Sequence, residues 1–365
     1  MDEMHKRVAV VGATGIAGQQ FLVALARHPW FEVVMLAASE RSAGKTYGAA
    51  LADPKTGARR WWCQEEPPAD VLDLRVENGD GLDVAGIDIV FSAVESDAAR
   101  VLEPQYAKTA AVLSTASAFR YEDDVPILVP GVNLGHAASD RRSAPPPWLE
   151  WLHRAAAELH DDGAGGDALP LLDRLRGRAR GDDFHAGHLG AGRSPGVAAL
   201  DILDNIIPYI PGEEEKVARE TGKILGVQGE DGIAPAAFPV SATCTRAAVS
   251  EGHTEAVAVS LGRRASRADV AAAFGELGSE LARLGLPSAP ERMITVHDDP
   301  FRPQPRLDRD ADGGMTTSVG RIRMIPRSRT ASSMSSCRTI RRWARRRARC
   351  WWRNISRRRA IYRSL

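Results

Sequence analysis

The stretch Val8-Ala-Val-Val-Gly-Ala-Thr-Gly-Ile-Ala-Gly18 decides the fold of the N-terminal third of the chain. An apolar run typical of a buried strand ends in a glycine, and two more glycines follow at intervals of three residues. At a turn from a strand into a helix, such glycines let backbone amides and the helix dipole receive a pyrophosphate. A tight turn that binds nothing is the less favoured alternative. We therefore predict a dinucleotide site formed by Gly12, Ala13, Thr14, Gly15, Ile16 and Gly18.

Residues 6–136 alternate apolar runs with helical patterns. The expected strands are Arg7 to Val11, Phe31 to Ala37, Ile87 to Ala93 and Ala111 to Ser114, and the expected helix is Gly15 to His28. This alternation is typical of a parallel sheet with helices on its faces. The fold predicted for residues 1–137 is therefore α/β, a Rossmann-like, doubly wound nucleotide domain.

The residues after the second expected strand indicate which dinucleotide is bound. Enzymes that use NAD commonly place an acidic side chain there, on the ribose hydroxyls. This chain has Ala38-Ser-Glu-Arg-Ser42, so Arg41, with Ser39 and Ser42, can hold a 2′-phosphate through charge-assisted hydrogen bonds. We predict NADP as the cofactor. Glu40 leaves NAD as the minor alternative, and Arg41 has the alternative of being an ordinary solvated loop charge.

A second domain of α+β type is expected over residues 192–323. Gly196 to Ile210 is apolar and helix-like, Glu213 to Leu225 is an amphipathic helix opened by acids, and Ser266 to Leu284 reads as a further helix. Phe238 to Ala242 and Thr254 to Leu261 have the composition of strands.

Composition limits the class of protein. With 365 residues, 44% hydrophobic and 26% charged, the chain can form two cores of ordinary size. No run of about 18 apolar residues predicts a membrane span, and the start leads straight into a strand instead of a signal peptide, so the cytoplasm is the expected compartment. No metal site is expected, because paired metal-ligand spacing is absent from the four cysteines, Cys63, Cys244, Cys337 and Cys350.

Longer stretches of the chain resemble the aspartate-semialdehyde dehydrogenases, in particular the branch shared by archaea and fungi. The matching stretches are Gly12-Ala-Thr-Gly15, Leu36-Ala-Ala-Ser-Glu-Arg-Ser-Ala-Gly-Lys45, Phe91-Ser-Ala-Val-Glu-Ser-Asp97, Ser114-Thr-Ala-Ser-Ala-Phe-Arg120, Asp201-Ile-Leu-Asp-Asn-Ile-Ile-Pro-Tyr-Ile210, Gly212-Glu-Glu-Glu-Lys216, Gly252-His-Thr-Glu-Ala256 and Pro303-Gln-Pro-Arg-Leu-Asp-Arg309. The resemblance implies NADPH-dependent reduction of aspartyl phosphate to aspartate semialdehyde with release of phosphate, a step towards lysine, methionine and threonine. It also implies that residues 192–323 form a catalytic and dimerisation domain, within a homodimer or homotetramer.

The same resemblance assigns roles to individual residues. His253 matches the family's acid/base histidine, a task that suits an imidazole near neutral pH, although a lone histidine between strands is more often structural. Arg246 matches the arginine whose planar fork holds the substrate carboxylate. The positions associated with substrate and phosphate are Arg120, Glu213 and Lys216, and those lining the nicotinamide are Ser92, Ala93, Ser114 and Thr115. For Glu213 and Lys216 the alternative is a helical i,i+3 ion pair.

Two stretches, residues 138–191 and 324–365, depart from the resemblance. The family's Asn-Cys-Thr nucleophile and its glutamine-bearing segment belong in the first stretch, and the sequence has neither. Cys244 is close to Arg246 but is better interpreted as a small buried hydrophobe. The first stretch also lacks the period of a strand or a helix, which predicts a poor core.

A shift of reading frame explains both departures. In a hypothetical GC-rich back-translation read one nucleotide later, residues 157–163 give Pro-Asn-Cys-Thr and residues 181–190 give Val-Met-Thr-Ser-Met-Gln. The cysteine codon then straddles Leu159 and His160, and the glutamine codon straddles Ala186 and Gly187. Residues 333–343 give a family-like segment in the other frame. We therefore predict that the chain, as its sequence stands, has no dehydrogenase activity.

The shifted stretches also explain two other patterns. Four histidines in the first stretch are too irregularly spaced to predict a metal site. They are His153, His160, His185 and His188. The arginines from Arg329 onward, interleaved with tryptophans, resemble a nucleic-acid arm, but an out-of-frame helix is the simpler interpretation, so no nucleic-acid partner is expected. Two other functions stay open. One is a related acyl reductase, acting on malonyl-CoA or N-acetyl-glutamyl phosphate, and the other is a catalytically dead protein that still binds the nucleotide.

Overall fold

The computed structural model describes residues 5–139, 179–187, 201–229, 232–249, 252–262, 264–279, 281, 286–325 and 331–338; over 137–139, 179–187 and 331–338 it describes the backbone alone. Within these ranges the chain divides into two compact units, one ending at Tyr121 and the other beginning at Glu122. None of the helices in these ranges is long and apolar enough to cross a membrane.

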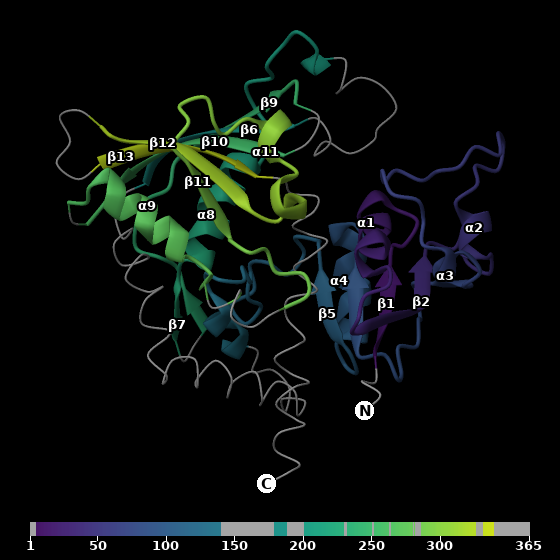
Figure 1. Cartoon of the computed structure of the whole chain (residues 1–365). Coiled ribbons are helices and arrows are strands. Elements are labelled where there is room, and N and C mark those ends of the chain that lie inside the picture. The colour runs from purple at the N-terminus through teal and green to yellow at the C-terminus, as the bar shows by residue number, and fades with distance from the viewer. Residues whose placement is uncertain are drawn as a thin grey trace. The chain divides into compact units, whose positions relative to one another are not determined.

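The first unit is built on a five-stranded parallel sheet with the order β3-β2-β1-β4-β5 (Figure 1). Its strands are β1 (Lys6–Val11), β2 (Phe31–Ala38), β3 (Val76–Asn78), β4 (Ile89–Ser92) and β5 (Ala111–Ser114). Between them run the helices α1 (Ile16–Leu25), α2 (Tyr47–Ala50), α3 (Ala69–Leu72) and α4 (Ser96–Tyr106). The chain builds outward from β1 to β3 on one side and then returns to β4 on the other. This is the doubly wound order that the sequence predicts.

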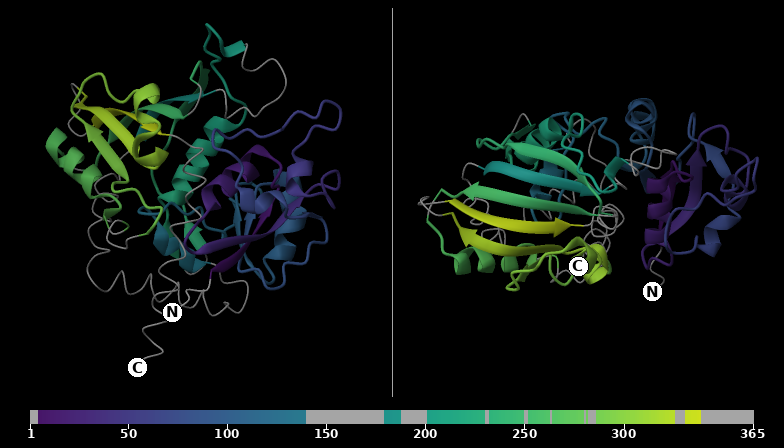
Figure 2. Two further views of the ribbon diagram at one scale, coloured as in Figure 1. Left: turned by 45° about the vertical axis from the view of Figure 1, so that its right-hand side comes forward. Right: turned by 90° about the horizontal axis from the view of Figure 1, so that it is seen from above.

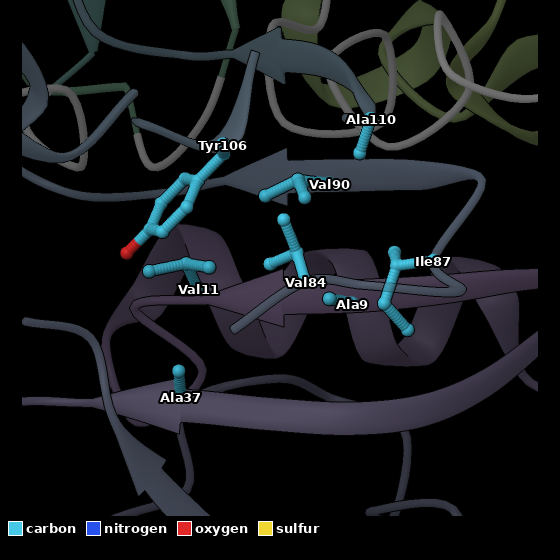
Figure 3. Close-up of a cluster of buried hydrophobic side chains, with 8 residues drawn as sticks. All are labelled: Ala9, Val11, Ala37, Val84, Ile87, Val90, Tyr106 and Ala110. Atoms are coloured by element: carbon cyan, nitrogen blue, oxygen red, sulfur yellow. The ribbon is translucent and has the colours of Figure 1, made fainter. Parts of the chain in front are cut away.

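The central strands of this sheet are buried, as their continuous apolar sequences predict. On one face, side chains from β1, β2 and β4 form a core with residues from the loops before β4 and β5 and from the end of α4 (Figure 3). The members of this core are Ala9, Val11, Ala37, Val84, Ile87, Val90, Tyr106 and Ala110. The tight packing fixes the carboxyl ends of β1 and β4, where the expected cofactor residues begin.

The second unit contains a six-stranded mixed sheet with the order β11-β12-β13-β10-β6-β9 (Figure 2). Its strands are β6 (Ala179–Gly187), β9 (Ala242–Ala247), β10 (His253–Ser260), β11 (Ile294–His297), β12 (Thr317–Met324) and β13 (Ala331–Arg338). The remaining elements are η1 (Leu134–Ser139), α8 (Glu213–Ile224), the hairpin β7 (Val227–Gly229) and β8 (Gly232–Ala234), α9 (Arg267–Glu276), α11 (Pro305–Asp308) and η3 (Ala311–Gly314). Helix α9 packs on β11 and β12, with Val270 and Phe274 in the shared core. The α+β expectation is confirmed.

Three expected elements of this unit have different bounds. The described part of the expected 196–210 helix is helical only at Asp201 and Ile202, and Ile207 instead forms a bridge with Arg246, just before Pro208, which has no amide hydrogen. The strand expected over 238–242 begins only at Ala242, beyond Pro239. The helix expected over 266–284 is interrupted after Glu276, where the backbone turns through Gly278 at φ +74°, and Ser279 and Leu281 are helical again.

Within the stretch 138–191, for which a poor core is predicted, the backbone of residues 179–187 forms strand β6. The core itself stays a prediction. The backbone of β6 lies between β9 and β10, parallel to the first and antiparallel to the second. Strand pairing uses backbone groups that every non-proline residue carries, so it does not require an alternating apolar pattern. Residues 188–191 and most of 138–178 lie outside the described residues, as does the tail after Arg338.

A small buried network joins the loop before η1 to the end of α8. The Asn133 side chain accepts from the amide of Val129 at 2.6 Å, so its Nδ2 faces Nδ1 of His136, 3.2 Å away. Nε2 of the same ring lies 3.1 Å from the carbonyl oxygen of Gly226. The ring therefore accepts at Nδ1 and donates at Nε2, which requires a neutral imidazole. Burial lowers the pKa of His136 below its usual value and outweighs the hydrogen bond to Gly226.

Candidate active site

The turn between β1 and α1 and the first turn of α1 each have one position that can accept only glycine. Gly12 has φ +79°, and a Cβ there would lie 2.5 Å from the carbonyl oxygen of Ala93. A Cβ on Gly18 would clash with the carbonyl oxygen of Gly12. The amides of Gly12 and Ala13 both donate to the carbonyl of Ala37, at 2.8 and 3.0 Å. The resulting concave backbone, at the start of a helix, is a cradle that side chains would fill and that suits a pyrophosphate.

The expected 2′-phosphate residues follow β2 in a single turn. The amides of Ser42 and Ala43 both donate to the carbonyl of Ser39, at 2.9 and 3.3 Å. Arg41 is exposed at the tip, and Lys45 donates to its carbonyl oxygen at 2.8 Å. Within this turn Arg41 is placed to meet an anion beyond the carboxyl end of β2, with the cation of Lys45 nearby.

The residues predicted to line the nicotinamide come together at the ends of β4 and β5. The amide and the hydroxyl of Thr115 both lie within hydrogen-bond distance of the carbonyl of Ser92, at 3.0 and 3.3 Å. Ser114 donates from its hydroxyl to the buried carboxylate of Glu103 at 2.5 Å. The Ser92 hydroxyl is buried and has no hydrogen-bond partner among the described residues, so a polar group of a bound molecule could satisfy it.

Arg120 closes the same region. Its guanidinium donates to the carbonyl oxygen of Thr115 at 2.8 Å, which orients a half-buried cation beside the end of β5.

In the second unit, Arg246 and His253 lie on two strands that both pair with β6. Arg246 is on β9 and pairs with Ala186, and His253 opens β10 and pairs with the same Ala186. The two side chains therefore belong to one row across three strands, with one position between them. Arg246 is held further by two backbone hydrogen bonds to Ile207, at 2.9 and 3.0 Å.

Glu213 and Lys216 form the ion pair that was the alternative interpretation for them. The ammonium of Lys216 lies 3.0 and 3.2 Å from the two carboxylate oxygens of Glu213, one turn along α8. Both side chains are about one-third exposed or less. The ammonium group of Lys216 thus lies in the first turns of α8, where a bound anion could compete with Glu213 for the ammonium.

Cys244 lies beside this pair and is poorly suited to act as a nucleophile. It is fully buried, and its amide donates to Glu214 at 2.9 Å. Burial, and then the carboxylates of Glu213 and Glu214, raise the pKa of its thiol to about 11. The expectation that Cys244 is a small buried hydrophobe agrees with this environment.

Sequence reasoning missed three residues that support the cofactor region. Gln19, Tyr47 and Glu103 are buried polar side chains that hold backbone or hydroxyl groups of the predicted site. The available signal was weak: Gln19 is a polar residue on an otherwise apolar helix, and Glu103 precedes a proline inside α4. A buried polar residue can be recognised only once its burial is known.

In the part of the chain whose side chains are described, no group of three or more histidine, cysteine or acidic residues could hold a metal ion. The four histidines considered in the sequence, His153, His160, His185 and His188, fall outside that part.

Comparisons with known proteins agree with this arrangement. The family model described as "Semialdehyde dehydrogenase, NAD binding domain" matches residues 7–140, and "Semialdehyde dehydrogenase, dimerisation domain" matches residues 163–335. The chain is 40% identical over 328 residues to an aspartate-semialdehyde dehydrogenase of Methanothermobacter thermautotrophicus, covering 87% of this chain and 88% of that protein. To the enzyme of that name from Saccharomyces cerevisiae it is 37% identical, covering 88% and 89%.

Among solved structures, the Candida albicans aspartate semialdehyde dehydrogenase with NADP has a TM-score of 0.76 and 31% identity, and the match covers 96% of this chain and 98% of that one. Both domain families match in order, and relatives from archaea and fungi match over nearly nine-tenths of the chain. The chain belongs to the aspartate-semialdehyde dehydrogenase family.

Proposed function

We propose that the catalytic residues of this NADP-dependent oxidoreductase are those of an aspartate-semialdehyde dehydrogenase, which reduces aspartyl phosphate to aspartate semialdehyde and releases phosphate. The observation that carries this proposal is the row that joins Arg246 to His253 through one position of β6. A cation that can grip a carboxylate and a group that can move a proton then stand two strands apart. Neighbouring strands lie about 4.8 Å apart, so the two backbones are separated by about 10 Å, and both side chains can reach one small substrate between them.

The cofactor fits the first unit. Gly12 and Gly18 leave the cradle that a pyrophosphate would occupy, and Arg41, Ser39 and Ser42 form the turn that would hold the 2′-phosphate. The residues assigned to the rest of this site are Ala13, Thr14, Gly15, Ile16, Ser92, Ala93, Ser114 and Thr115. NADPH bound there would supply a hydride to the acyl carbon of the substrate.

The residues of the second unit would position the substrate and move protons. Arg246 would bind the carboxylate through its planar fork. His253 would take the proton from a thiol nucleophile and return one during reduction, a task worth about 10²-fold or more in rate. Lys216, with Glu213, would receive the phosphate and the substrate's charged groups. For Arg120, which belongs to the first unit, we also propose a role in substrate binding.

The nucleophile is the missing part. Thioester formation requires a thiolate at the acyl carbon, and the sequence has no cysteine between Cys63 and Cys244. Support for the frame-shift explanation comes from position 186. The shifted frame encodes glutamine there, and the same position pairs with both Arg246 and His253.

The family implies homo-oligomers and a small-molecule substrate, in keeping with the match to its dimerisation domain. We propose a homodimer or homotetramer, located in the cytoplasm. We also propose the division into a cofactor domain over residues 1–137, a catalytic domain over 192–323, and two shifted stretches, 138–191 and 324–365.

The test uses a chain in which both shifted stretches are read in the other frame. NADPH formation is followed with aspartate semialdehyde and phosphate, and acyl reduction is followed with malonyl-CoA and with N-acetyl-glutamyl phosphate. Turnover confined to the first substrate supports the proposal. Preference for either of the others would reassign the substrate, and NADP binding without turnover of any of them would leave only a nucleotide-binding role.

A further inference from the structure

Two buried side chains hold the carbonyl groups of the glycine turn. The hydroxyl of Tyr47 donates to the carbonyl oxygen of Ala13 at 2.7 Å, and Nε2 of Gln19 donates to that of Thr14 at 3.1 Å. Both side chains are completely buried. Burial, and then the neighbouring Cys63, raise the pKa of Tyr47 far above its ordinary value, so its hydroxyl remains protonated and donates.

Gln19 is fixed at a second place as well. Its Nε2 also donates to the carbonyl oxygen of Arg60 at 2.8 Å, and its Oε1 accepts from the amide of Trp62 at 2.8 Å. The amide thus makes three hydrogen bonds to backbone groups of two separate segments. Its orientation cannot reverse without leaving buried polar groups unpaired, which is unfavourable.

The direction of these carbonyls determines where the amides of the turn point. In a trans peptide the C=O and the next N–H point in opposite directions. With the Ala13 carbonyl directed at Tyr47, the N–H of Thr14 points away from the protein core. In the same way the Thr14 carbonyl directs the N–H of Gly15, which donates to Gly12 at 3.0 Å and closes the turn.

The outcome is a set of available donors at the start of α1. The amides of Thr14, Ile16 and Ala17 donate to no acceptor within the described ranges. They precede the point where α1 can satisfy its own amides, so an anion is the natural partner.

We propose that Tyr47 and Gln19 are positioning residues for the cofactor, because they keep two carbonyl groups turned away from the pyrophosphate and leave the amides to receive it. This inference rests on the proposed cofactor role of the glycine turn. If either carbonyl rotated outward, its negative end would face a phosphate oxygen, and cofactor binding would first have to reorder the turn.

The same unit offers a matched control for each residue. Tyr106 is also completely buried and donates its hydroxyl to a backbone carbonyl, that of Gly79, at 2.5 Å. Gln20 neighbours Gln19 on α1 and is also buried, but neither atom of its amide has a partner among the described residues. Replacing the control residues removes the same groups without touching the turn.

The experiment measures binding of two ligands to the full 365-residue chain and to the variants Tyr47→Phe, Gln19→Met, Tyr106→Phe and Gln20→Met. NADPH carries the pyrophosphate, whereas adenosine 2′-monophosphate carries the 2′-phosphate without it. We expect Tyr47→Phe and Gln19→Met to weaken NADPH binding by about tenfold, the equivalent of one hydrogen bond, and to leave the affinity for adenosine 2′-monophosphate unchanged. The two controls should keep both affinities.

Equal loss of both ligands, or NADPH affinity equal to that of the controls, overturns the positioning role while the cofactor site stands. Failure of the unsubstituted chain to bind NADPH overturns the cofactor site itself, and the positioning role with it. Tyr47→Phe removes a single oxygen atom, so it keeps the test decisive if Gln19→Met fails to fold.

Discussion

His253 and Arg246 pair with the same residue of β6, Ala186, from opposite sides. Residues that face each other across neighbouring strands point to the same face of the sheet. Position 186 of the backbone is thereby the strand partner of both residues. In the hypothetical shifted frame the family's glutamine occupies this position. The frame-shift prediction therefore implies a glutamine in the strand position between Arg246 and His253.

The first prediction is that the 365-residue chain shows no dehydrogenase activity, whereas a chain with both stretches read in the other frame is active. Leu159 and His160 supply no sulfur where the thiolate is required. NADPH formation with aspartate semialdehyde and phosphate is the measurement. A third protein, corrected but with alanine in place of the glutamine at position 186, should bind substrate more weakly. Comparable activity in the uncorrected chain would refute the frame shift.

The second prediction separates the two residues of the row in the corrected chain. Arg246→Lys should mainly raise KM for aspartate semialdehyde, because a point charge replaces a bidentate fork. His253→Ala should mainly lower kcat, by about 10²-fold or more, because proton transfer is lost. Steady-state kinetics distinguishes the two effects. Full turnover in His253→Ala would show that the proton passes elsewhere.

Cofactor choice is the third prediction. Arg41 stands exposed on the turn after β2, so Arg41→Ala should weaken NADPH far more than NADH. Binding of both nucleotides is measured by fluorescence, with Arg27→Ala as a control beyond the end of α1. An equal loss for NADPH and NADH would mean that Arg41 does not contact the 2′-phosphate.

The fourth prediction concerns Cys244. Its burial and its raised pKa, about 11, leave almost no thiolate near neutral pH. At pH 8, iodoacetamide should therefore modify the half-buried Cys63 well before Cys244, as read by peptide mass spectrometry. Cys244→Ala should also retain the activity of the corrected chain. Loss of activity in that variant, without loss of folding, would make Cys244 the nucleophile.

The fifth prediction follows from the neutral ring of His136. Its pKa in the folded protein is lowered, so the unfolded chain binds the proton first as the pH falls. The contribution to stability is complete above about pH 6.5, the ordinary value, and is lost as the pH falls through the folded-state pKa. Urea unfolding between pH 8 and pH 5 should give a shallower pH dependence for His136→Gln than for the unsubstituted chain.

The exposed His5 supplies the control for this measurement. His5→Gln should leave the slope unchanged, and an unchanged slope in His136→Gln would contradict the role of the buried ring.

The sequence predicted four of the five strands of the first unit, because its central strands β1 and β4 are buried and its turn requires glycine; the short β3 was missed. Every expected strand there agrees with the structure to within two residues at each end. The second unit was harder, since its sheet is mixed and its strands carry polar residues such as Thr243, Arg246 and Glu255. Strand β6 could not be predicted from periodicity, because its sequence does not alternate apolar and polar residues. Its backbone pairing with β9 and β10 identifies it as a strand.

For the candidate site, the residues expected to bind the cofactor or substrate could be predicted from the sequence. The buried residues that hold them in place could not. A glycine spacing or an arginine after a strand has a local signature, whereas the link from Gln19 to Trp62 spans 43 positions along the chain. Such contacts depend on tertiary packing, which no short pattern records.

That link has a consequence for how the first unit folds. The glycine turn forms locally, within a few residues, but its final shape depends on Tyr47 and on the segment around Arg60, which arrive from 34 and 41 positions away. Contacts of large sequence separation close slowly, because chain entropy must be lost before they form. The pairing of β1 with β4 joins positions still farther apart, 81 between Val8 and Ile89. A newly made chain would therefore be able to complete its nucleotide turn before it completes its sheet.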